Sequence, residues 1–499
     1  MRRAAARKRL ENSQAPVVDP GLHAGPTAAY AAISTAAADR IIAAAKQLLS
    51  ETGVVFDPGT EADALLTAAG CQMVGDGIVR MPVDVIDRAL ARSAKSCTLW
   101  NRDGTKAIRI DDKHTWFFPG MTNIAIFDLK TGEPRPSNRS DLAMITRLAD
   151  GLPNIDGVCI SCKDVSRVDQ YGEIDEFVCM IENTTKPLEY LCEHASSLKA
   201  VIDISAALRH GHANLRAKPY FLHIITPLPL KFADTHIEQI IMAARAGIPV
   251  SVGTLPIGGA STPITLAGGI AHSLATDFAA MVLAQQASPG AFCIGSSDVC
   301  FMEPASGAIG NFSQTSIADM VMCQIRRSMG IPSLTGIAGA TNARRFNQDA
   351  VWELSSNMMQ TFYSRPATCD YLGSLDQGLT YSAHALLFCD DVAGLLRRMW
   401  EGFEVNDDQL ALGLANELGP AGNFLGQKHT AENCRSQVWN SRYFGANMPL
   451  SNSGAADASL FERINQDLQQ RLKAPPAADL PQEIVNQINA ILSEFKGVN

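Results

Sequence analysis

Apolar residues recur at helical spacing through the first hundred residues and predict short helices separated by turns. Residues 41–49 place their apolar side chains on one face of a helix, and a glycine follows its last turn. Two further helices are expected within 60–70 and from residue 81, where a proline occupies the first turn. Residues 97–110 hold two β-prone runs around a turn, which predicts a hairpin. We therefore expect residues 1–114 to form a helical and hairpin extension.

From about residue 115 the chain alternates between short β-prone runs and long helical stretches. The β-prone runs lie at residues 124–128, 156–161, 188–192, 220–225, 248–254, 291–296, 331–335 and 367–372. Eight alternating units are what an α/β fold of the (β/α)8 TIM-barrel type requires. A doubly wound sheet is the alternative architecture, but no Gly-x-Gly-x-x-Gly follows any of the runs.

Two amphipathic helices are predicted at the end of the sequence. Apolar residues recur at helical spacing within 460–472 and 484–495, and a proline-rich segment separates the two runs. Such helices need a surface against which to bury their apolar faces. We therefore divide the chain into the extension at 1–114, a catalytic barrel at 115–455 and C-terminal amphipathic helices at 456–499.

Composition and charge exclude several classes of protein. The net charge of -9 over 499 residues argues against a general binder of nucleic acid. Apolar residues make up 46% of the chain, but its most apolar stretch, 264–282, is interrupted by polar residues and does not predict a membrane span. The 12 cysteines lack the spacing of a disulfide framework, which indicates free thiols in a reducing compartment. We therefore expect a soluble, cytoplasmic protein that binds neither nucleic acid nor a membrane.

Polar and glycine-rich segments follow several of the predicted strands, where a barrel gathers its chemistry. The richest segment is 253–268, whose glycines and hydroxyls exceed what a tight turn needs and indicate a loop of the site. Carboxylates follow two later strands. Asp298 and Glu303 follow one, and Asp370 and Asp376 lie at the end of the other, although Asp is also common as a helix N-cap.

Metal chemistry has less support in the sequence. Cys159 and Cys162 have the spacing of a zinc or redox pair, but they lie on a predicted strand, so packing in the barrel wall is the preferred interpretation. Glu193 and His194 end another strand and can either ligate a metal or hold a substrate. The chain has no His-Glu-x-x-His, no Gly-x-Ser-x-Gly and no phosphate-loop motif. No bound metal is expected.

Several longer segments resemble the trimethylamine methyltransferase family, whose members pass a methyl group from a methylated amine to a corrinoid protein. The matching segments are 119–123 (Pro-Gly-Met-Thr-Asn), 128–136, 147–156, 253–268, 373–380 and 418–430 (Leu-Gly-Pro-Ala-Gly-Asn-Phe-Leu-Gly-Gln-Lys-His-Thr). They occur in the family's order and are spread over most of the chain. The resemblance implies a barrel with helical additions, in agreement with the strand count.

Trimethylamine-specific members of that family carry pyrrolysine in the active site, whereas this sequence holds only the standard residue types. The corresponding region is placed near 336–342. The resemblance therefore implies the branch without pyrrolysine, whose members demethylate quaternary amines such as glycine betaine. The corrinoid (cobalamin) is expected on a partner protein that docks over the barrel mouth, because this chain has no Asp-x-His-x-x-Gly cofactor motif.

A quaternary ammonium cannot donate hydrogen bonds, so aromatic faces and nearby carboxylates recognise it. Candidate cage residues are Tyr371, Phe346 and Phe301, whose alternative role is core packing. The other substrate-binding candidates are the charged residues Asp298, Glu303, Asp370 and Asp376, the possible betaine-carboxylate ligands Arg344, Arg345, Asn342 and Thr254, and the strand-end pair Glu193 and His194. The residues expected to face the corrinoid are Gly258, Gly259, Ser261 and Thr262. No general acid is required, so no catalytic residue is assigned.

The preferred prediction is a methyltransferase that moves a methyl group from a quaternary amine, glycine betaine or a similar compound, to the Co(I) corrinoid of a partner protein. We also expect a homo-oligomer. Two other functions stay open. A barrel lyase or hydrolase with a metal at Glu193 and His194 would lose activity to a chelator. A betaine-binding protein would bind the ligand without any methyl transfer.

Overall fold

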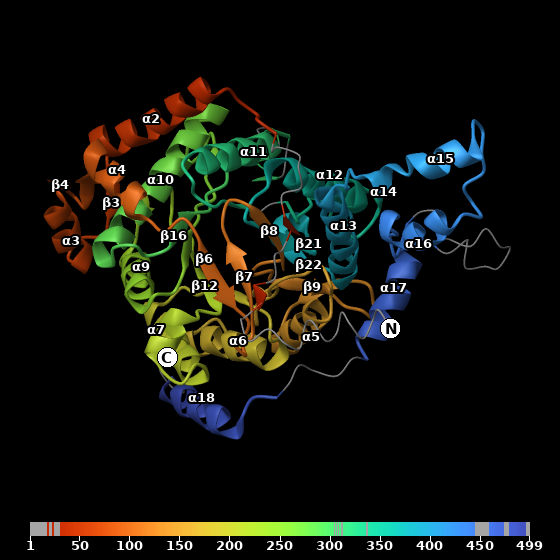
Figure 1. Ribbon diagram of the computed structural model, residues 1–499. Helices are drawn as coiled ribbons and strands as arrows, with labels where there is room; N and C mark the ends of the chain where they lie inside the picture. The colour runs from red at the N-terminus through yellow and green to blue at the C-terminus, as the bar shows by residue number, and fades with distance from the viewer. Residues whose placement is uncertain are drawn as a thin grey trace.

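A computed structural model of the chain shows a ring of strands enclosed by helices, with additions at both ends of the sequence (Figure 1). The structure describes residues 17–18, 22–23, 30–303, 305, 307, 309–310, 313–335, 338–444, 459–473 and 479–495.

Parallel strands form the barrel wall. One sheet has the order β11 (Leu188–Leu191), β12 (Phe221–Ile225), β14 (Val250–Val252) and β16 (Cys293–Gly295), all parallel. A second sheet joins β19 (Leu334–Thr335), β20 (Thr368–Leu372) and β8 (His114–Pro119), again in parallel. The pairing of β20 with β8 joins the last strand of the barrel to the first. The predicted TIM-barrel type of α/β fold is therefore confirmed.

Two of the predicted barrel strands differ from the structure. The first strand of the barrel is β8, whereas the predicted run at 124–128 contains β9 (Ala125–Phe127), which pairs with β10 (Pro134–Pro136) and β22 (Thr380–Tyr381) in a separate small sheet. Strand β8 has consecutive buried aromatic residues, as expected where both faces of a strand are covered. Residues 156–162 occupy the second strand position but form only single bridges, such as Val158 with Leu188.

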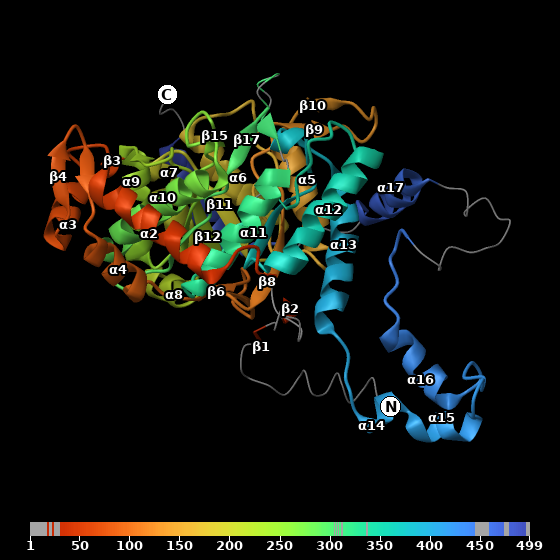
Figure 2. The same ribbon diagram turned by 90° about the horizontal axis from the view of Figure 1, so that it is seen from above.

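Long helices cover the outside of the barrel (Figure 2). They are α5 (Arg139–Asp150), α6 (Gln170–Asn183), α7 (Ala195–Leu208), α8 (His212–Ala217), α9 (Asp234–Ala246), α10 (Leu266–Ala287), α11 (Ser313–Ser328), α12 (Gln348–Ser364) and α13 (Ala383–Glu401). Among the described residues, α10 is the one helix long and apolar enough to cross a membrane, with a mean hydropathy of 1.4. Its most apolar window is 78% buried inside the protein, as in the core helix of a globular domain.

The N-terminal extension packs on α10. It contains the predicted helices as α2 (Thr35–Glu51), α3 (Glu61–Ala69) and α4 (Val83–Arg92), and the predicted hairpin as β6 (Cys97–Trp100) and β7 (Lys106–Ile110). Its small sheet contains β3 (Val54–Phe56), β4 (Gln72–Gly75) and β5 (Ile78–Arg80), and β13 (Lys231–Phe232), which follows barrel strand β12, completes it. All three helices contact α10, so the extension and the barrel share one hydrophobic core.

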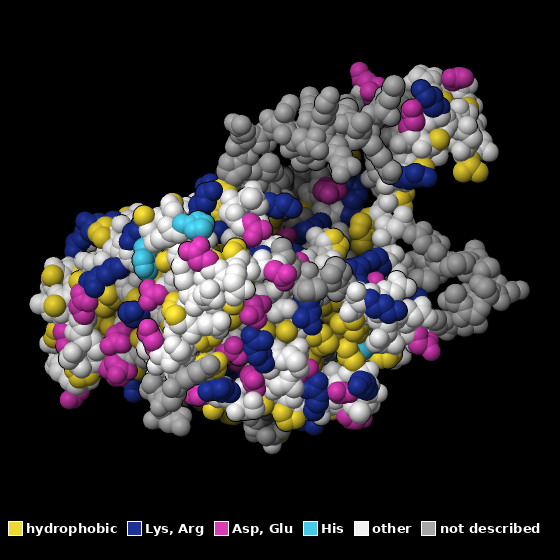
Figure 3. Space-filling view, turned by 90° about the horizontal axis from the view of Figure 1, so that it is seen from below, with side chains coloured by type: hydrophobic (Ala, Val, Ile, Leu, Met, Phe, Trp, Pro, Cys, Tyr) yellow, Lys and Arg dark blue, Asp and Glu magenta, His cyan; other side chains and the backbone are white. Residues whose placement is uncertain are grey.

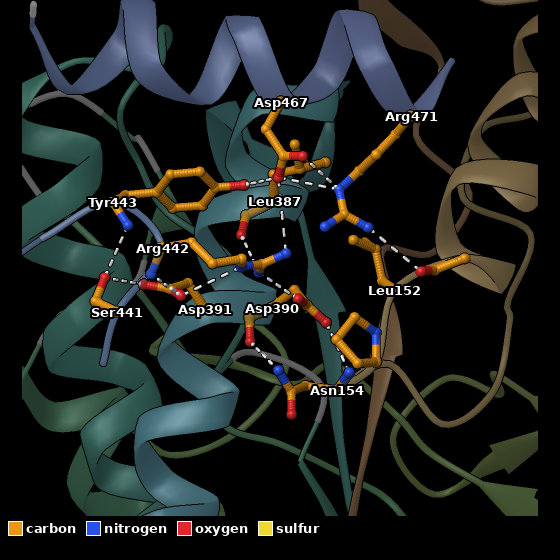
Figure 4. A network of polar contacts seen from close by, with 12 residues as sticks. Leu152, Asn154, Leu387, Asp390, Asp391, Ser441, Arg442, Tyr443, Asp467 and Arg471 are labelled. Carbon is orange, nitrogen blue, oxygen red and sulfur yellow. Dashed lines mark hydrogen bonds and ion pairs between the residues drawn. The ribbon is translucent and has the colours of Figure 1, made fainter. Parts of the chain in front are cut away.

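The two predicted C-terminal helices are α17 (Leu460–Arg471), which packs on α13, and α18 (Gln482–Glu494), which packs on α7 and α6. A polar network anchors α17 (Figure 4). Arg442 pairs with the fully buried carboxylate of Asp390, and the hydroxyl of Tyr443 donates to Asp467 on α17 at 2.6 Å. Asp467 also accepts from Arg471 at 2.9 Å. These contacts hold α17 against the barrel, although it is far in the sequence from α13, on which it packs.

Residues 402–438, called the arm below, project from the barrel in all three overall views (Figures 1, 2 and 3). The arm holds the short helices α14 (Asp407–Leu410), α15 (Leu412–Leu418) and α16 (Lys428–Gln437). In the described part of the chain, none of these helices contributes a buried residue. Several large apolar side chains of the arm are strongly exposed, among them Phe403 at 80% and Leu425 at 83%.

Candidate functional site

Two carboxyl groups lie on the inner wall of the barrel, Glu189 on β11 and Asp370 on β20. Side chains of a strand alternate between its two faces. The hydroxyl of Tyr190 donates to the backbone of α6, so Tyr190 points outward and its neighbour Glu189 points inward. Likewise the thiol of Cys369 accepts from Thr361 on α12, so Cys369 points outward and Asp370 points inward.

These two carboxyls are buried without a cation. Glu189 is fully buried, and neither of its carboxyl oxygens has a hydrogen-bond partner among the described residues. Asp370 is 2% exposed and accepts from the hydroxyl of Thr368 at 3.0 Å, whereas its other oxygen has no partner in the described structure. Burial raises the pKa of Asp370 to about 8. Burial, and then the charge of Asp370, raises the pKa of Glu189 well above its usual value.

A second carboxyl pair lies beside the first. Asp298, in the loop after β16, shares a hydrogen bond with Asp319 on α11. Burial and the charge of Asp298 raise the pKa of Asp319 well above its usual value, because two carboxylates this close cannot both ionise at low cost. The charge of Asp298 also raises the pKa of Asp370, so the two pairs belong to one group.

Tyr371 lies within the same group. Burial, followed by the charge of Asp298, raises the pKa of its hydroxyl. Its backbone φ is 63°, a conformation that costs free energy for a large side chain, and it sits at a bulge between Cys369 and Leu372 where the pairing with β8 is irregular. Strained backbone of this kind is typical of functional sites. The bulge directs the Tyr371 ring toward the carboxyls.

The glycine-rich loop after β14 borders this group. The backbone N–H of Asp298 donates to the backbone oxygen of Thr254 at 3.1 Å, which joins the loops after β14 and β16. The hydroxyls of Thr254 and Thr262 are buried and have no partner among the described residues. Gly258 packs against Phe301, and a Cβ atom there would come within 3.0 Å of the ring. The ring of Phe301 therefore fills the space that the missing side chain leaves.

The rest of the predicted loop is ordered by local contacts. The hydroxyl of Ser261 accepts from the backbone of Ile257 at 2.8 Å, and Gly259 has a φ of 89° that suits glycine. Among the predicted residues, the structure thus brings together Asp298, Asp370, Tyr371 and Thr254, while Phe301 packs on Gly258 of the loop that follows Thr254.

Other predicted residues lie at the surface. Asp376 is half-exposed and 3.6 Å from Arg344, whose side chain is 88% exposed. Arg345 pairs with Glu133 at 2.6 Å, and both side chains are exposed. Neither arginine reaches the carboxyl group inside the barrel.

The remaining predicted residues serve local structure. The carboxylate of Glu303 accepts from the backbone of Ala305 at 3.0 Å, and the backbone N–H of Asn342 donates to Glu353 at 2.7 Å. Phe346 packs on Phe388 of α13, with ring centroids 5.8 Å apart, outside the barrel. It lines a cavity of about 730 Å³ between α12 and α17.

Glu193 and His194 lie outside the barrel wall as well. Their backbone and ring nitrogens, respectively, approach the same carboxyl oxygen of Glu173 on α6, at 3.0 and 3.1 Å. Glu173 thereby fixes the turn that leads from β11 into α7. No three His, Cys, Asp or Glu side chains in the described residues are grouped to hold a metal ion.

Sequence reasoning missed two members of the group, Glu189 and Asp319. The signal for Glu189 was present, because a charged residue in the middle of a four-residue apolar strand is rarely buried without a function. Asp319 gave a weaker signal, since a single Asp on a long helix is usually exposed.

Comparison with known proteins places the chain among methyltransferases. A family model described as trimethylamine methyltransferase (MTTB) matches residues 1–495. The trimethylamine methyltransferase MttB of Desulfitobacterium hafniense is 24% identical over 420 residues, which cover 84% of each chain. The glycine betaine methyltransferase of the same species is 24% identical over 404 residues, 79% of this chain and 82% of the relative.

Two further similarities cover nearly all of the chain. The trimethylamine methyltransferase MttB1 of Methanosarcina mazei is 25% identical over 472 residues, 91% of this chain and 94% of the relative. Among solved structures, a hydroxylamine complex of MtmB has a TM-score of 0.50 at 14% identity, over 94% of this chain and 92% of that chain. This structural similarity supports the fold.

The raised pKa of Asp370 predicts a loss of stability with rising pH. A carboxyl whose pKa is higher in the folded state contributes stability below its unfolded pKa, and loses that contribution as the pH rises through the folded pKa. For Asp370 this window runs from the usual value of 3.8 to about 8. Calorimetry should therefore show Asp370→Asn melting above the parent protein by a margin that grows between roughly pH 4 and 8 and then stays constant.

The control for this measurement is Asp376→Asn at the half-exposed carboxyl beside Arg344. Its difference in melting temperature from the parent should stay constant over the same range. A constant margin for Asp370→Asn would show that its carboxyl is not the group that titrates.

Proposed function

We propose, since the chain belongs to the trimethylamine methyltransferase family, that it transfers a methyl group from a quaternary amine to the corrinoid of a partner protein. The relatives carry the names trimethylamine methyltransferase and glycine betaine methyltransferase. The absence of pyrrolysine from this sequence favours quaternary amines over trimethylamine.

The observation that carries the proposal is Glu189. A buried carboxylate without hydrogen bonds or a cation is costly, and a bound cation removes that cost. A quaternary ammonium is such a cation and needs no hydrogen-bond acceptor. Asp370, whose pKa burial raises to about 8, would take up its charged form beside a bound cation, and the ring of Tyr371 adds an aromatic face in the same group.

The residues of this chain would bind, orient and shield the substrate. Glu189 and Asp370 would hold the ammonium at the barrel axis, and the ring of Tyr371 would exclude water from it. The corrinoid, when bound, supplies a reduced cobalt nucleophile that accepts the methyl group. Transfer of the methyl group would break the C–N bond and leave its electron pair on the nitrogen, which would lose its positive charge, so this chain would not need to supply a general acid. Release of the neutral amine leaves the carboxyl pair free for another cation.

The partner that carries the corrinoid would dock over the barrel mouth. Six large apolar side chains, between 50% and 83% exposed, lie in five loops that follow barrel strands: Ile124, Val168, Leu228, Leu255, Ile264 and Leu379. We call this set the rim. Loops that follow parallel strands lie at one end of a barrel, so the rim surrounds the mouth. Exposed apolar side chains grouped in this way are typical of a protein-binding surface.

The direct test is methyl transfer to free Co(I) cobalamin from glycine betaine, carnitine, proline betaine, choline and trimethylamine. Loss of the Co(I) absorbance, together with the demethylated amine in the mass spectrum, is expected for a quaternary amine and not for trimethylamine. Glu189→Gln should lower kcat/KM by about tenfold to a hundredfold, because one charge facing the ammonium is lost. Glu401→Gln, at an exposed carboxylate on α13, is the matched control.

Other outcomes of this assay would favour the competing functions. Binding of a quaternary amine without any transfer, even with a corrinoid protein present, would indicate a binding protein. Loss of activity on addition of a chelator would indicate a metal-dependent enzyme. Transfer from trimethylamine alone would contradict the proposed substrate class.

The rim can be tested separately from the substrate site. Leu255→Asp and Ile264→Asp should raise the KM for a cognate corrinoid protein by about tenfold or more. Both side chains are exposed in the free protein, and each substitution places a charge in an apolar contact that the docked partner would bury. Amine binding should not change. Val74→Asp, a half-exposed apolar position on β4 of the extension, is the control. An unchanged KM in both rim variants would exclude this docking surface.

We also propose that the chain forms a homo-oligomer through the arm. Its helices are too short to be stable alone, and the side chains of Phe403 and Leu425 are exposed. Light scattering should give a mass of two or more times the 53.5 kDa of one chain. Phe403→Asp with Leu425→Asp should reduce that mass, whereas Met73→Asp on the extension should not. A monomeric parent protein would contradict the proposal.

A further inference from the structure

In the described residues, the charged groups that act on Glu189 and Asp370 are all acidic. The groups that act on the pKa values of Glu189 and Asp370 in the described structure are carboxylates and the hydroxyl of Thr368, with no cation among them. Arg326 acts on Asp319 and Asp298, but it lies on the outer side of β16, where it donates to Asp277 at 2.7 Å.

The two arginines that the sequence suggested as ligands of a substrate carboxylate do not enter the barrel. The side chain of Arg344 is 88% exposed and faces Asp376, and Arg345 is held by Glu133 at the surface. The undescribed positions between residues 303 and 338 carry no basic side chain in the sequence: Pro304, Ser306, Ala308, Asn311, Phe312, Gly336 and Ile337. A substrate carboxylate inside the barrel would therefore meet carboxylates without a compensating guanidinium or ammonium.

The uncharged polar groups at the site suit a different substituent. The buried hydroxyls of Thr254 and Thr262 have no partner among the described residues, and each can both donate and accept. A hydroxyl on the substrate can satisfy such a group. A carboxylate there would still be repelled by Asp298, whose backbone is bonded to that of Thr254.

We propose that the substrate is a quaternary ammonium with a net positive charge and no carboxylate, of the choline or tetramethylammonium type, and that Glu189 and Asp370 select it over zwitterions such as glycine betaine. This inference rests on the proposed methyl transfer from a quaternary amine. It narrows the substrate class from all quaternary amines to those that are cations overall.

Choline and glycine betaine form a matched pair for the test, because they share the trimethylammonium group and differ in a hydroxymethyl against a carboxylate. Isothermal titration of the full chain, without any corrinoid, measures both dissociation constants. The value for choline should be lower by about tenfold or more. Tetramethylammonium should bind more tightly than glycine betaine as well.

Glu189→Gln tests whether the carboxyl is the source of the preference. It should weaken choline binding by about tenfold and change betaine binding little. The ratio of the dissociation constant of glycine betaine to that of choline should therefore fall toward one. Asp370→Asn is the second variant and should act in the same direction. Glu401→Gln should leave both constants unchanged.

Tighter binding of glycine betaine than of choline would overturn the inference, and so would an unchanged ratio in both variants. Arg344→Ala, if it abolished betaine binding, would show that this arginine turns inward to hold the carboxylate. In each of these cases methyl transfer from betaine would still support the proposed function. If no quaternary ammonium either bound or donated a methyl group, both proposals would fail.

Discussion

The parallel pairing of β8 with β20 is the contact on which the rest of the architecture depends. It joins the first strand of the barrel to the last, and the pairs Thr368 with Trp116 and Cys369 with Phe117 set which side chains point inward. A shift of one residue in this register would turn Asp370 toward the helices and Cys369 toward the barrel axis. The bulge after Cys369 interrupts the pairing near the mouth, where the backbone adopts its unusual conformation. The ring closure therefore positions the site.

The interior of the barrel departs from the usual rule that buried charges are paired. Two other buried carboxylates follow the rule, since Asp277 is held by Arg326 and Asp390 by Arg442. Glu189 has no such partner among the described residues. A stable protein can tolerate the free-energy cost of one unpaired buried carboxyl. In natural proteins such unpaired groups concentrate at sites where a ligand supplies the missing partner. The contrast distinguishes a binding site from a structural ion pair.

The segments outside the barrel differ in how closely they pack against it. The N-terminal extension shares its core through α10, and the C-terminal helices are fixed by packing and by the network around Arg442. The rim and the arm instead leave large apolar side chains in solvent. The rim surrounds the barrel mouth, whereas the arm projects away from the body (Figure 2). The two proposed contacts, with a corrinoid protein and with another subunit, thus involve separate surfaces.

The sequence by itself determined the periodic elements and the kind of fold. Helical spacing located α2, α3, α4, α17 and α18, and the alternation of strands and helices predicted the barrel. Asp298, Asp370 and Tyr371 were also predicted as site residues, because strand ends are local features of a sequence, and the structure places these three close together. Only the tertiary structure decided that Glu189 faces inward, that Asp319 approaches Asp298, and that Arg344 stays in solvent. The direction in which a side chain points, the group it pairs with and the extent of its burial depend on residues far apart in the chain. No local pattern of the sequence therefore encodes them.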